Sequence, residues 1–391
     1  MNKIKNKLLV VLLLITMLPV LLLGGYALIS SMGSLQESSI VIHKNKVTLV
    51  TERIENYLAV VGSDLFYLRD SNALHHYFRA LKSDSSHSQR LLLTNLRSSF
   101  RKFSEQKGIY QQVRFIDTNG MEIVRIDRNE GKSKNVSDTV LQEKSSHEYF
   151  KQTTKKDTLY ISDISLNREN GKIEEPLRPV IHFSTPVFDK QENLQGIVVL
   201  NVILDKVFGF IQEQESDGEE LTFTSPQGYY FYHADPEKRW GSAKNLATNI
   251  TLFSEHPDLK DKLAPRKGLG SLETDDGVVT YKSVMLNEGK IHLGNLVSIA
   301  PKDVVLKPAR HFLYVFLGIT LLTLVLSFFL ALFLSYSITH PLVQLTDSID
   351  KLSKGDLETP IKINSNDEIG TLAHAVELLR KSMKILIKRA S

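Results

Sequence analysis

Polar side chains in the middle of the chain could bind a small molecule. Tyr149 falls on a short predicted helix, Asp163 on the strand after it, and Arg178, His182 and Ser184 around the next strand. His182 and Ser184 share one face of that strand, because side chains alternate along a strand. Each residue alone also has a structural explanation, such as a core aromatic, a capping carboxylate or a hydrogen-bonded core histidine. Arg178 would suit a carboxylate ligand, because a guanidinium can hold both carboxylate oxygens.

The sequence contains no arrangement typical of catalysis. His233-Ala234-Asp235 is a lone His/Asp pair without the context of a Ser or Cys nucleophile, and no phosphate-binding loop is present. His75-His76 does not suggest metal, because adjacent positions on a helix point apart. The chain has no cysteine, which excludes disulfides and metal thiolates. We therefore expect no enzyme activity, no metal and no cofactor.

Composition and charge point to an ordinary protein surface between two apolar ends. The 391 residues carry a formal net charge of +4, which gives no reason to expect nucleic acid as a partner. Residues 30–311 hold equal numbers of basic and acidic side chains. This balance is typical of a soluble domain. The length leaves room for two to three domains.

The elements that would position the polar side chains begin with a long helix. Apolar residues recur at helical spacing from about Leu35 to Leu68, which predicts a helix on the order of 50 Å long. A second helix carries Leu96, Phe100 and Phe103 on one face. The pattern then changes to strands: residues 113–117 and 122–126 flank an Asn-Gly turn, which is a hairpin signal. After a helix at 147–154, further strands are expected at 158–166, 179–188 and 196–203.

A weaker second copy of this order follows. A helix at 205–214 precedes strands at 221–225 and 229–233, and later strands are expected at 270–273, 278–285 and 291–299. The hairpin turns predict two small antiparallel sheets stacked along one long helix. If the ligand site lies outside the first copy, the region of Tyr230, Asp235 and Trp240 in the second copy is the next candidate.

Two uncharged stretches predict membrane helices. Residues 312–336 are apolar over 25 residues, enough to cross a hydrocarbon core of roughly 30 Å. Residues 8–29 form the other span. A cleaved signal peptide is the alternative there, but the span exceeds a typical signal core and no clean cleavage site follows. Lys3, Lys5 and Lys7 place the N-terminus in the cytoplasm, so the C-terminus returns to that side. The basic residues just before the second span disagree with this orientation, and we give them less weight.

The segment after the second span has the pattern of two short coiled-coil helices. Leu342, Leu345, Ile349 and Leu352 recur at steps of three and four, and Gly355 suits a helix end. After a connector, a longer seam follows that consists of Ile369, Leu372, Val376, Leu379, Met383 and Leu386. Such helices cannot bury their seams alone. We expect them to pair across a dimer as a parallel four-helix bundle.

At these spacings the motifs Pro341-Leu342, Gly355-Asp356-Leu357 and Asp367-Glu368-Ile369-Gly370 resemble a HAMP signalling domain. A chance heptad pair is the alternative, but it would not require the glycine, connector and acidic opening in this order. The resemblance implies that a small motion of the membrane helix changes the packing of the bundle. The residues expected to carry this relay are Pro341, Gly355, Glu368, Ile369, Leu372, Val376 and Leu379.

The stretches "VRFIDTNGMEIVRI", "HEYF", "LYISDISL", "VIHFSTPVFD", "GIVVLNV" and "SPQGYYFYHADPEKRWG" resemble bacterial double Cache sensor domains, whose modules are PAS-like sheets. The resemblance covers about residues 35–305 and implies an extracytoplasmic small-molecule sensor, with ligand usually in the membrane-distal module. The Arg-x-Trp-Tyr signature of amino-acid-binding members is absent, since His147-Glu148-Tyr149-Phe150 stands in its place. An amino-acid ligand is therefore disfavoured.

Together these features predict an α+β membrane protein with two stacked PAS-like antiparallel sheets on a long helix, two transmembrane helices and a HAMP four-helix coiled coil in a homodimer. The expected segments are a cytoplasmic N-terminus (1–7), a first membrane helix (8–29), a sensor (30–311) with a first module at about 70–204 and a second at about 205–300, a second membrane helix (312–336) and HAMP (337–388).

The predicted function is a two-pass receptor of the cytoplasmic (inner) membrane. It would bind a small molecule outside and relay a signal to a separate cytoplasmic protein, with membrane lipid as its other partner. One alternative is the truncated sensor part of a histidine kinase, chemoreceptor or diguanylate cyclase, because no output segment follows HAMP in this sequence. An alternative of another class is a membrane-tethered binding or scaffold protein without signalling.

Overall fold

The computed structural model describes residues 3–390 except 156–157, 170, 264–267 and 275–276. The chain separates into two units. Glu37–Val305 forms the larger unit, and Met1–Gln36 together with Leu306–Ser391 forms the smaller one. Met1 and Asn2 of the predicted segment 1–7 lie outside the described residues.

One continuous helix, α1 (Lys3–Arg69), runs through the N-terminal part of the chain. In the larger unit it buries one apolar stripe, which consists of Val47, Val50, Ile54, Leu58, Val61, Leu65 and Leu68. These residues join a single core cluster with side chains of both sheets. The predicted long helix is confirmed, and its stripe is the surface against which both sheets pack.

Two helices follow α1, where the sequence analysis predicted one. α2 (Asn72–Leu81) begins at Ser71, whose hydroxyl accepts the amide of Leu74, and α3 (Ser86–Lys107) begins at Ser85 in the same way. Such serine caps satisfy amides that a helix start leaves free. α3 buries Leu96, Phe100 and Phe103 as predicted.

The first sheet is antiparallel, with its strands in the order β3-β2-β1-β9-β8-β4 and β5 paired to β8. Its strands are β1 (Tyr110–Asp117), β2 (Glu122–Asn129), β3 (Lys132–Asn135), β4 (Tyr160–Ile161), β5 (Ser165–Leu166), β8 (Pro179–Phe188) and β9 (Leu194–Ile203). A 3-10 turn (Asp138–Val140) and α4 (Glu148–Lys155) lie between β3 and β4. β1 is central, because it pairs with β2 on one side and β9 on the other.

The single strand predicted at residues 158–166 is wrong. The structure has two short pieces, β4 and β5, with Ser162 between them. The Ser162 hydroxyl accepts the amide of His182 at 3.0 Å and donates to the carbonyl of Asp163 at 2.8 Å. The Ser162 hydroxyl thus accepts an amide that a backbone carbonyl would accept in a continuous β-ladder. The chain leaves the sheet at this point. A small hairpin that the sequence did not reveal follows, formed by β6 (Arg168–Glu169) and β7 (Lys172–Ile173).

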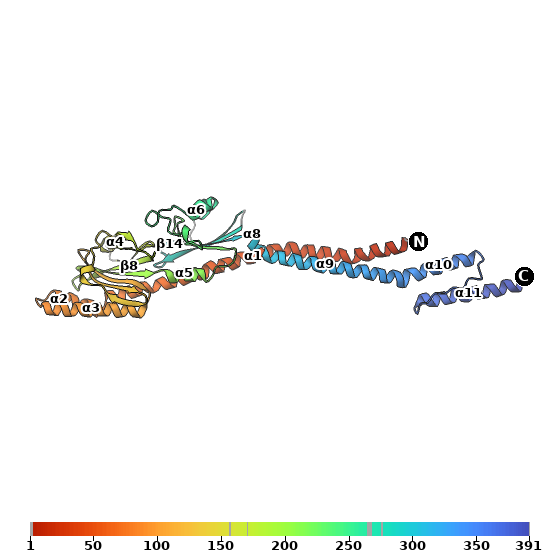
Figure 1. Cartoon of the computed structure of the whole chain (residues 1–391), viewed down its shortest axis with the longest axis horizontal. Helices are drawn as coiled ribbons and strands as arrows, with labels where there is room; N and C mark the ends of the chain where they lie inside the picture. Colours follow the sequence, from red (N-terminus) through yellow and green to blue (C-terminus); the bar gives the residue numbers. More distant parts are fainter. Residues whose placement is uncertain (1–2, 156–157, 170, 264–267, 275–276, 391) are drawn as a thin grey trace. The chain divides into compact units, whose positions relative to one another are not determined.

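The second sheet has the order β11-β10-β14-β13-β12 and follows α5 (Asp205–Gln212). Its strands are β10 (Glu220–Thr224), β11 (Tyr230–Tyr232), β12 (Leu269–Glu273), β13 (Gly277–Leu286) and β14 (Ile291–Pro301). The connection from β11 to β12 contains 3-10 turns Pro236–Lys238 and Pro257–Leu259 and the short helices α6 (Leu252–Glu255) and α7 (Lys260–Leu263). Figure 1 shows the two sheets one after the other along α1, the first beside α2 and α3 and the second toward α8 (Lys302–Val305).

In the smaller unit, α9 (Lys307–Leu334), a π-helical stretch (Ser335–Thr339) and α10 (His340–Ser353) follow one another without a break. Within the described residues, this one helical stretch is long and apolar enough to cross a membrane, and a shorter apolar stretch covers Leu14–Ser30. The two stretches touch each other. The Ser327 hydroxyl donates to Thr16 at 3.1 Å, and a Cβ on Gly24 would collide with the ring of Phe316.

The motifs after the apolar helix have local structural roles. Pro341 lies in the first turn of α10, and Gly355 follows its end with φ +95°, a conformation that favours glycine. Asp367 accepts the amides of Ile369 and Gly370 and so caps α11 (Glu368–Ala390). Gly370 must lack a side chain, because a Cβ there would lie 1.9 Å from the carbonyl oxygen of Ser365.

Candidate functional site

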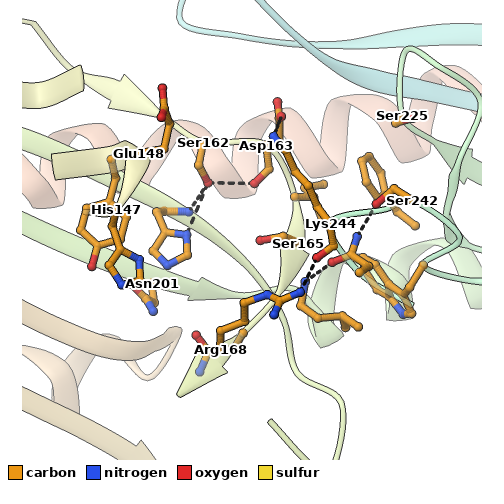
Figure 2. Close-up of a pocket in the computed structure, with 18 of the residues that line it drawn as sticks. His147, Glu148, Ser162, Asp163, Ser165, Arg168, Asn201, Ser225, Ser242 and Lys244 are labelled. Carbon is orange, nitrogen blue, oxygen red and sulfur yellow. Dashed lines mark hydrogen bonds and ion pairs between the residues drawn. The ribbon is translucent and has the colours of Figure 1, made fainter. Parts of the chain in front are cut away.

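A cavity of about 980 Å³ lies in the larger unit, and residues of both sheets line it. The first module supplies side chains from β1, α4, β8 and β9 and from the segment 160–169, and the second module supplies 225–231 and 240–245. Figure 2 shows His147, Glu148 and Asn201 on one side, Ser225, Ser242 and Lys244 on the other, and Arg168 between them.

Tyr149 on α4 forms the centre of an aromatic group at the inner side of the cavity. Its ring lies parallel to the imidazole of His182, with 5.1 Å between centroids, and 5.2 Å from that of His147. Burial lowers the pKa of His182 to about 3 and of His147 to about 4, and the nearby charges of Arg114 and Lys144 add to this effect. Both imidazoles are therefore neutral near pH 7. Burial also raises the pKa of the Tyr149 hydroxyl.

Arg114, in the middle of β1, is almost completely buried at 2% exposure. Its Nη1 donates to the Tyr149 hydroxyl at 3.0 Å and lies 3.4 Å from a carboxylate oxygen of Glu122, and its Nη2 donates to the side-chain oxygen of Asn201 at 2.6 Å. The third guanidinium nitrogen, Nε, is buried and has no hydrogen-bond partner among the described residues. A buried guanidinium that is not fully satisfied is unusual, and it favours an additional acceptor at this place.

A second buried arginine, Arg125 on β2, is held by acids of the protein itself. It forms two bonds of 2.8 Å to Asp127 and one of 2.8 Å to Glu169. Glu169 also accepts from Gln112 at 2.9 Å. Burial raises the pKa of Glu169, but Arg125 and Gln112 outweigh burial and lower it overall. This charge is thus compensated internally, unlike that of the neighbouring Lys144.

Lys144 precedes α4 and lines the cavity with only 4% of its surface exposed. Its ammonium donates to the side-chain oxygen of Gln142 at 2.6 Å. Among the described residues, no carboxylate lies within ion-pairing distance of Nζ, and burial followed by repulsion from Arg114 lowers its pKa. A buried ammonium without a carboxylate is costly. Lys144 therefore presents a buried ammonium to the cavity, with which an anionic group could pair.

The structure places the five predicted ligand-binding residues in different surroundings. Tyr149, Asp163 and His182 line the cavity. Ser184 is fully buried, and its hydroxyl lies 2.5 Å from that of Thr153. Arg178 is not among the lining residues: its Nη1 donates to Asn129 at 2.8 Å, and its Nε lies 3.3 Å from Glu174.

Of the alternative region in the second module, Tyr230 and Trp240 line the same cavity, whereas Asp235 caps a 3-10 turn by accepting the amide of Glu237. Within the described part of the chain, no group of three or more His, Cys, Asp or Glu is placed to hold a metal ion.

Sequence reasoning missed Arg114 and Lys144. Arg114 carried a usable signal, because a charged residue between Val113 and Phe115 interrupts an otherwise apolar strand. Buried arginines in strands are rare unless they are paired. Lys144 carried no such signal, since it stands in a polar loop without periodicity. Only the fold brings it against β1.

Two models of known protein families match the chain. The family model described as "Bacterial histidine kinase, sensor domain" matches residues 53–294, more than half of the sequence. The chain belongs to this family. The HAMP domain model matches residues 333–384, which confirms the HAMP resemblance. The matched sensor region contains every residue that lines the cavity.

Individual relatives agree with this assignment. The heme sensor protein HssS of Staphylococcus aureus (strain JH9) is 28% identical over 166 residues, which are 42% of this chain and 35% of HssS. The chain thus spans about a third of the length of the curated relatives it matches.

Two solved structures share the fold. The extracellular domain of the putative histidine kinase vpHK1S-Z8 aligns with 20% identity and a TM-score of 0.57, over 71% of this chain and 96% of that domain. A domain of a putative sensory box/GGDEF family protein from Vibrio parahaemolyticus aligns with the same identity and TM-score, over 69% of this chain and 99% of that domain. This histidine kinase sensor chain therefore combines a sensor fold with HAMP, as signal-transducing receptors do.

Proposed function

We propose that this sensor chain is a receptor for an anionic small molecule that binds in the cavity between the two modules. The observation that carries the proposal is Lys144, a buried ammonium that pairs with no carboxylate in the described part of the chain, beside Arg114, whose Nε has no acceptor there. A carboxylate ligand would pair with the Lys144 ammonium and supply an acceptor for Nε of Arg114. Tyr149 and His182 would then contact the ligand through their rings, and Asp163 would contact it at the exposed edge of the cavity.

The size of the site suits a metabolite or a larger cofactor. Ligand cavities commonly enclose about 300–1,000 Å³, and about 980 Å³ lies at the upper end. Because HssS is named as a heme sensor, heme is a second candidate ligand. Its two carboxylates would suit Arg114 and Lys144, and His147 and His182 are neutral imidazoles of the kind that bind iron.

The proposal includes a two-pass topology in the cytoplasmic membrane, with membrane spans at 8–29 and 312–336. The exposed apolar side chains of both stretches support it. In the first stretch these include Leu14, Ile15, Leu18, Leu21, Leu22 and Leu23, all more than half exposed. Membrane lipid would cover them. Reporter fusions should place residue 200 outside and the C-terminal end in the cytoplasm. A cytoplasmic signal at residue 200 would refute this topology.

The output side of the proposal is a HAMP homodimer that acts on a cytoplasmic signalling partner. Two apolar residues of the proposed seam support it, because Leu372 and Leu379 are each about half exposed in the single chain. A parallel four-helix bundle of two chains would bury them. In the alternative, a membrane-tethered binding protein, ligand would leave the packing of these helices unchanged.

Thermal unfolding of the full chain in detergent tests ligand binding. The panel consists of acetate, lactate, succinate, malate, citrate and hemin. A true ligand should stabilise the protein by roughly 2.7 kcal/mol at a hundredfold excess over its dissociation constant.

Lys144→Gln should abolish that stabilisation, because it removes the uncompensated charge. Lys190→Gln, which removes an exposed charge from a residue that does not line the cavity, should preserve it. Failure of every carboxylate on the panel, hemin included, to stabilise the wild-type chain would contradict the proposal.

A further inference from the structure

The second module lines the cavity with residues 225–231 and with one loop after β11. Trp240, Ser242, Ala243, Lys244 and Asn245 all line the cavity, although they belong to the connection after β11. We call residues 240–245 the wall loop. Arg114 and Lys144 of the first module line the same cavity, and Figure 2 shows Ser242 and Lys244 of the wall loop on the opposite side from His147 and Asn201.

Two hydrogen bonds fasten the wall loop to the first module. The amide of Leu166 donates to the side-chain oxygen of Asn245 at 2.9 Å, and Nη2 of Arg168 donates to the carbonyl of Lys244 at 2.9 Å. Asn245 is only 9% exposed. Its side-chain oxygen and nitrogen are both hydrogen-bonded, which favours one orientation of the amide, because leaving a buried polar group unpaired is costly. The contact between the modules is therefore specific.

The wall loop is also shaped from within its own module. The amide of Trp240 donates to the carbonyl of Tyr230 at 2.8 Å, which ties the loop to β11. The side-chain nitrogen of Asn245 donates to the Ser242 hydroxyl at 2.9 Å. The Trp240 ring packs against Phe231 and Phe208, with 6.0 Å between centroids in each pair. A preformed loop of this kind can contact a ligand without a large ordering cost.

We infer that the ligand site is composite: the first module holds the anionic group with Arg114 and Lys144, and the wall loop contacts the rest of the same ligand with Trp240 and its neighbours. This inference rests on the proposed function for the nature of the ligand. It adds that the second module contacts the part of the ligand that lies opposite the ligand's anionic group. This contact would make the second module a determinant of ligand specificity. Because one molecule would touch both modules, binding would also strengthen the contact between them.

The rates at which charged reagents modify a cysteine can test whether the wall loop and Lys144 line the same cavity. The chain has no cysteine, so Ala243→Cys provides one thiol at the wall loop. Ala243 is exposed and lines the cavity. The full chain in detergent is treated with an anionic methanethiosulfonate, the sulfonatoethyl reagent, and a cationic one, the trimethylammonioethyl reagent, and the two rates are compared.

A shared cationic cavity should raise the rate of the anionic reagent relative to the cationic one. Adding Lys144→Gln to Ala243→Cys should lower this ratio of anionic to cationic rates about threefold. The lost positive charge would slow the anionic reagent and speed the cationic one. Adding Lys190→Gln should leave the ratio unchanged. An identical ratio in the Lys144→Gln background would overturn the inference, since the loop and the cationic end would then not share one space.

The panel of carboxylates and hemin separates this inference from the proposed function. A panel compound that stabilises the protein should also slow modification of Ala243→Cys at least severalfold. A compound that stabilises but leaves both rates unchanged binds in the first module alone, which refutes the composite site and keeps the proposed function. If no compound stabilises, the proposed function fails, and the rate ratio still decides whether the cavity is shared.

Discussion

The Nη1 atom of Arg114 donates a hydrogen bond to the Tyr149 hydroxyl over 3.0 Å, with the guanidinium 5.1 Å from the centre of the ring. This contact joins the central strand β1 to helix α4, which covers the sheet. It places the buried guanidinium beside Tyr149, whose ring lies next to the imidazoles of His147 and His182. A ligand that contacted both Arg114 and Tyr149 would touch the sheet and its covering helix.

Arg114→Ala should destabilise the protein strongly. Among the described residues, the substitution leaves the fully buried Glu122 carboxylate with one ion-pair partner, the more distant Arg125 at 3.8 Å. Breaking a buried ion pair typically costs about 3–5 kcal/mol. Denaturant unfolding of the full chain should show a loss near the lower end of that range, because the amide of Gln142 still donates to Glu122.

Arg178→Ala is the matched arginine control. Its side chain is about a third exposed and pairs with Glu174 at 3.3 Å. Exposed pairs contribute at most about 1 kcal/mol, so the loss should stay below that value. Equal losses for both variants would mean that Arg114 is not paired as described.

The stability of the larger unit should fall as pH falls below 6.5. His182 has a folded pKa of about 3, below its unfolded value of 6.5, so the unfolded chain binds the proton first. This contribution is fully present above pH 6.5 and is lost progressively down to about pH 3. Between pH 6.5 and 5 the loss should reach about 2 kcal/mol.

His182→Gln should reduce this slope without removing it, because His147, with its pKa lowered to about 4, contributes in the same pH range. Chemical denaturation at a series of pH values measures the slope. His76→Gln, an exposed position on α2 outside the cavity, is the control and should leave the slope as it is. An unchanged slope in His182→Gln would show that His182 does not stay neutral in the folded protein.

Glu219 should be the main acid-sensitive link between α1 and the second sheet. Ser298 donates to it at 2.6 Å, His43 Nδ1 lies 3.0 Å away, and Lys46 pairs with it. Burial raises its pKa, but these hydrogen bonds outweigh burial and lower the pKa to about 2. The stabilisation is therefore present above pH 4.5 and is lost as pH falls from 4.5 to 2.

Glu219→Gln should lower the free energy of unfolding at pH 7 by about 1–3 kcal/mol, since it leaves buried donors poorly satisfied. The same variant should lose less stability than wild type between pH 4.5 and 2. Glu213→Gln also breaks a pair with α1, the exposed contact to Arg53, and should cost less than about 1 kcal/mol.

Single cysteines in α11 test the proposed HAMP dimer. Leu372→Cys and Leu379→Cys should crosslink efficiently in membranes, because seam positions of two parallel helices bring their α-carbons within about 7 Å. Lys381→Cys, an exposed position off the seam, should crosslink poorly. Ligand should change the ratio between the two seam positions. Equal crosslinking at all three positions, with or without ligand, would indicate a passive anchor.

Glu377, another position off the proposed seam of α11, has a specific structural role. It accepts the amide of Ile361 at 3.0 Å and pairs with Arg380, whose Nη1 donates to the carbonyl of Leu357. These bonds tie the connector to the helix. Glu377→Cys would disturb the connector, so Lys381 is the better control position.

Local rules of the chain were enough to predict several elements. The apolar stripe of α1, the hairpin of β1 and β2, the helix α4 and the end of α10 at Gly355 all follow from periodicity, an Asn-Gly turn or a glycine end. Each depends on residues within a few positions of one another. The motifs that indicate HAMP are local in the same sense.

The tertiary structure alone decided the composition of the site. Arg114 contacts Tyr149, 35 residues later, and Asn201, 87 residues later, and Leu166 meets Asn245 across 79 residues. Strand β1 pairs with β9, which follows α4 and β8 in the sequence. Contacts of this kind depend on which distant strands pair and in which register, because one residue of slip would turn every side chain to the other face. The sequence therefore determined the elements and some of their polar residues, whereas long-range strand pairing decided which of those residues meet around the cavity.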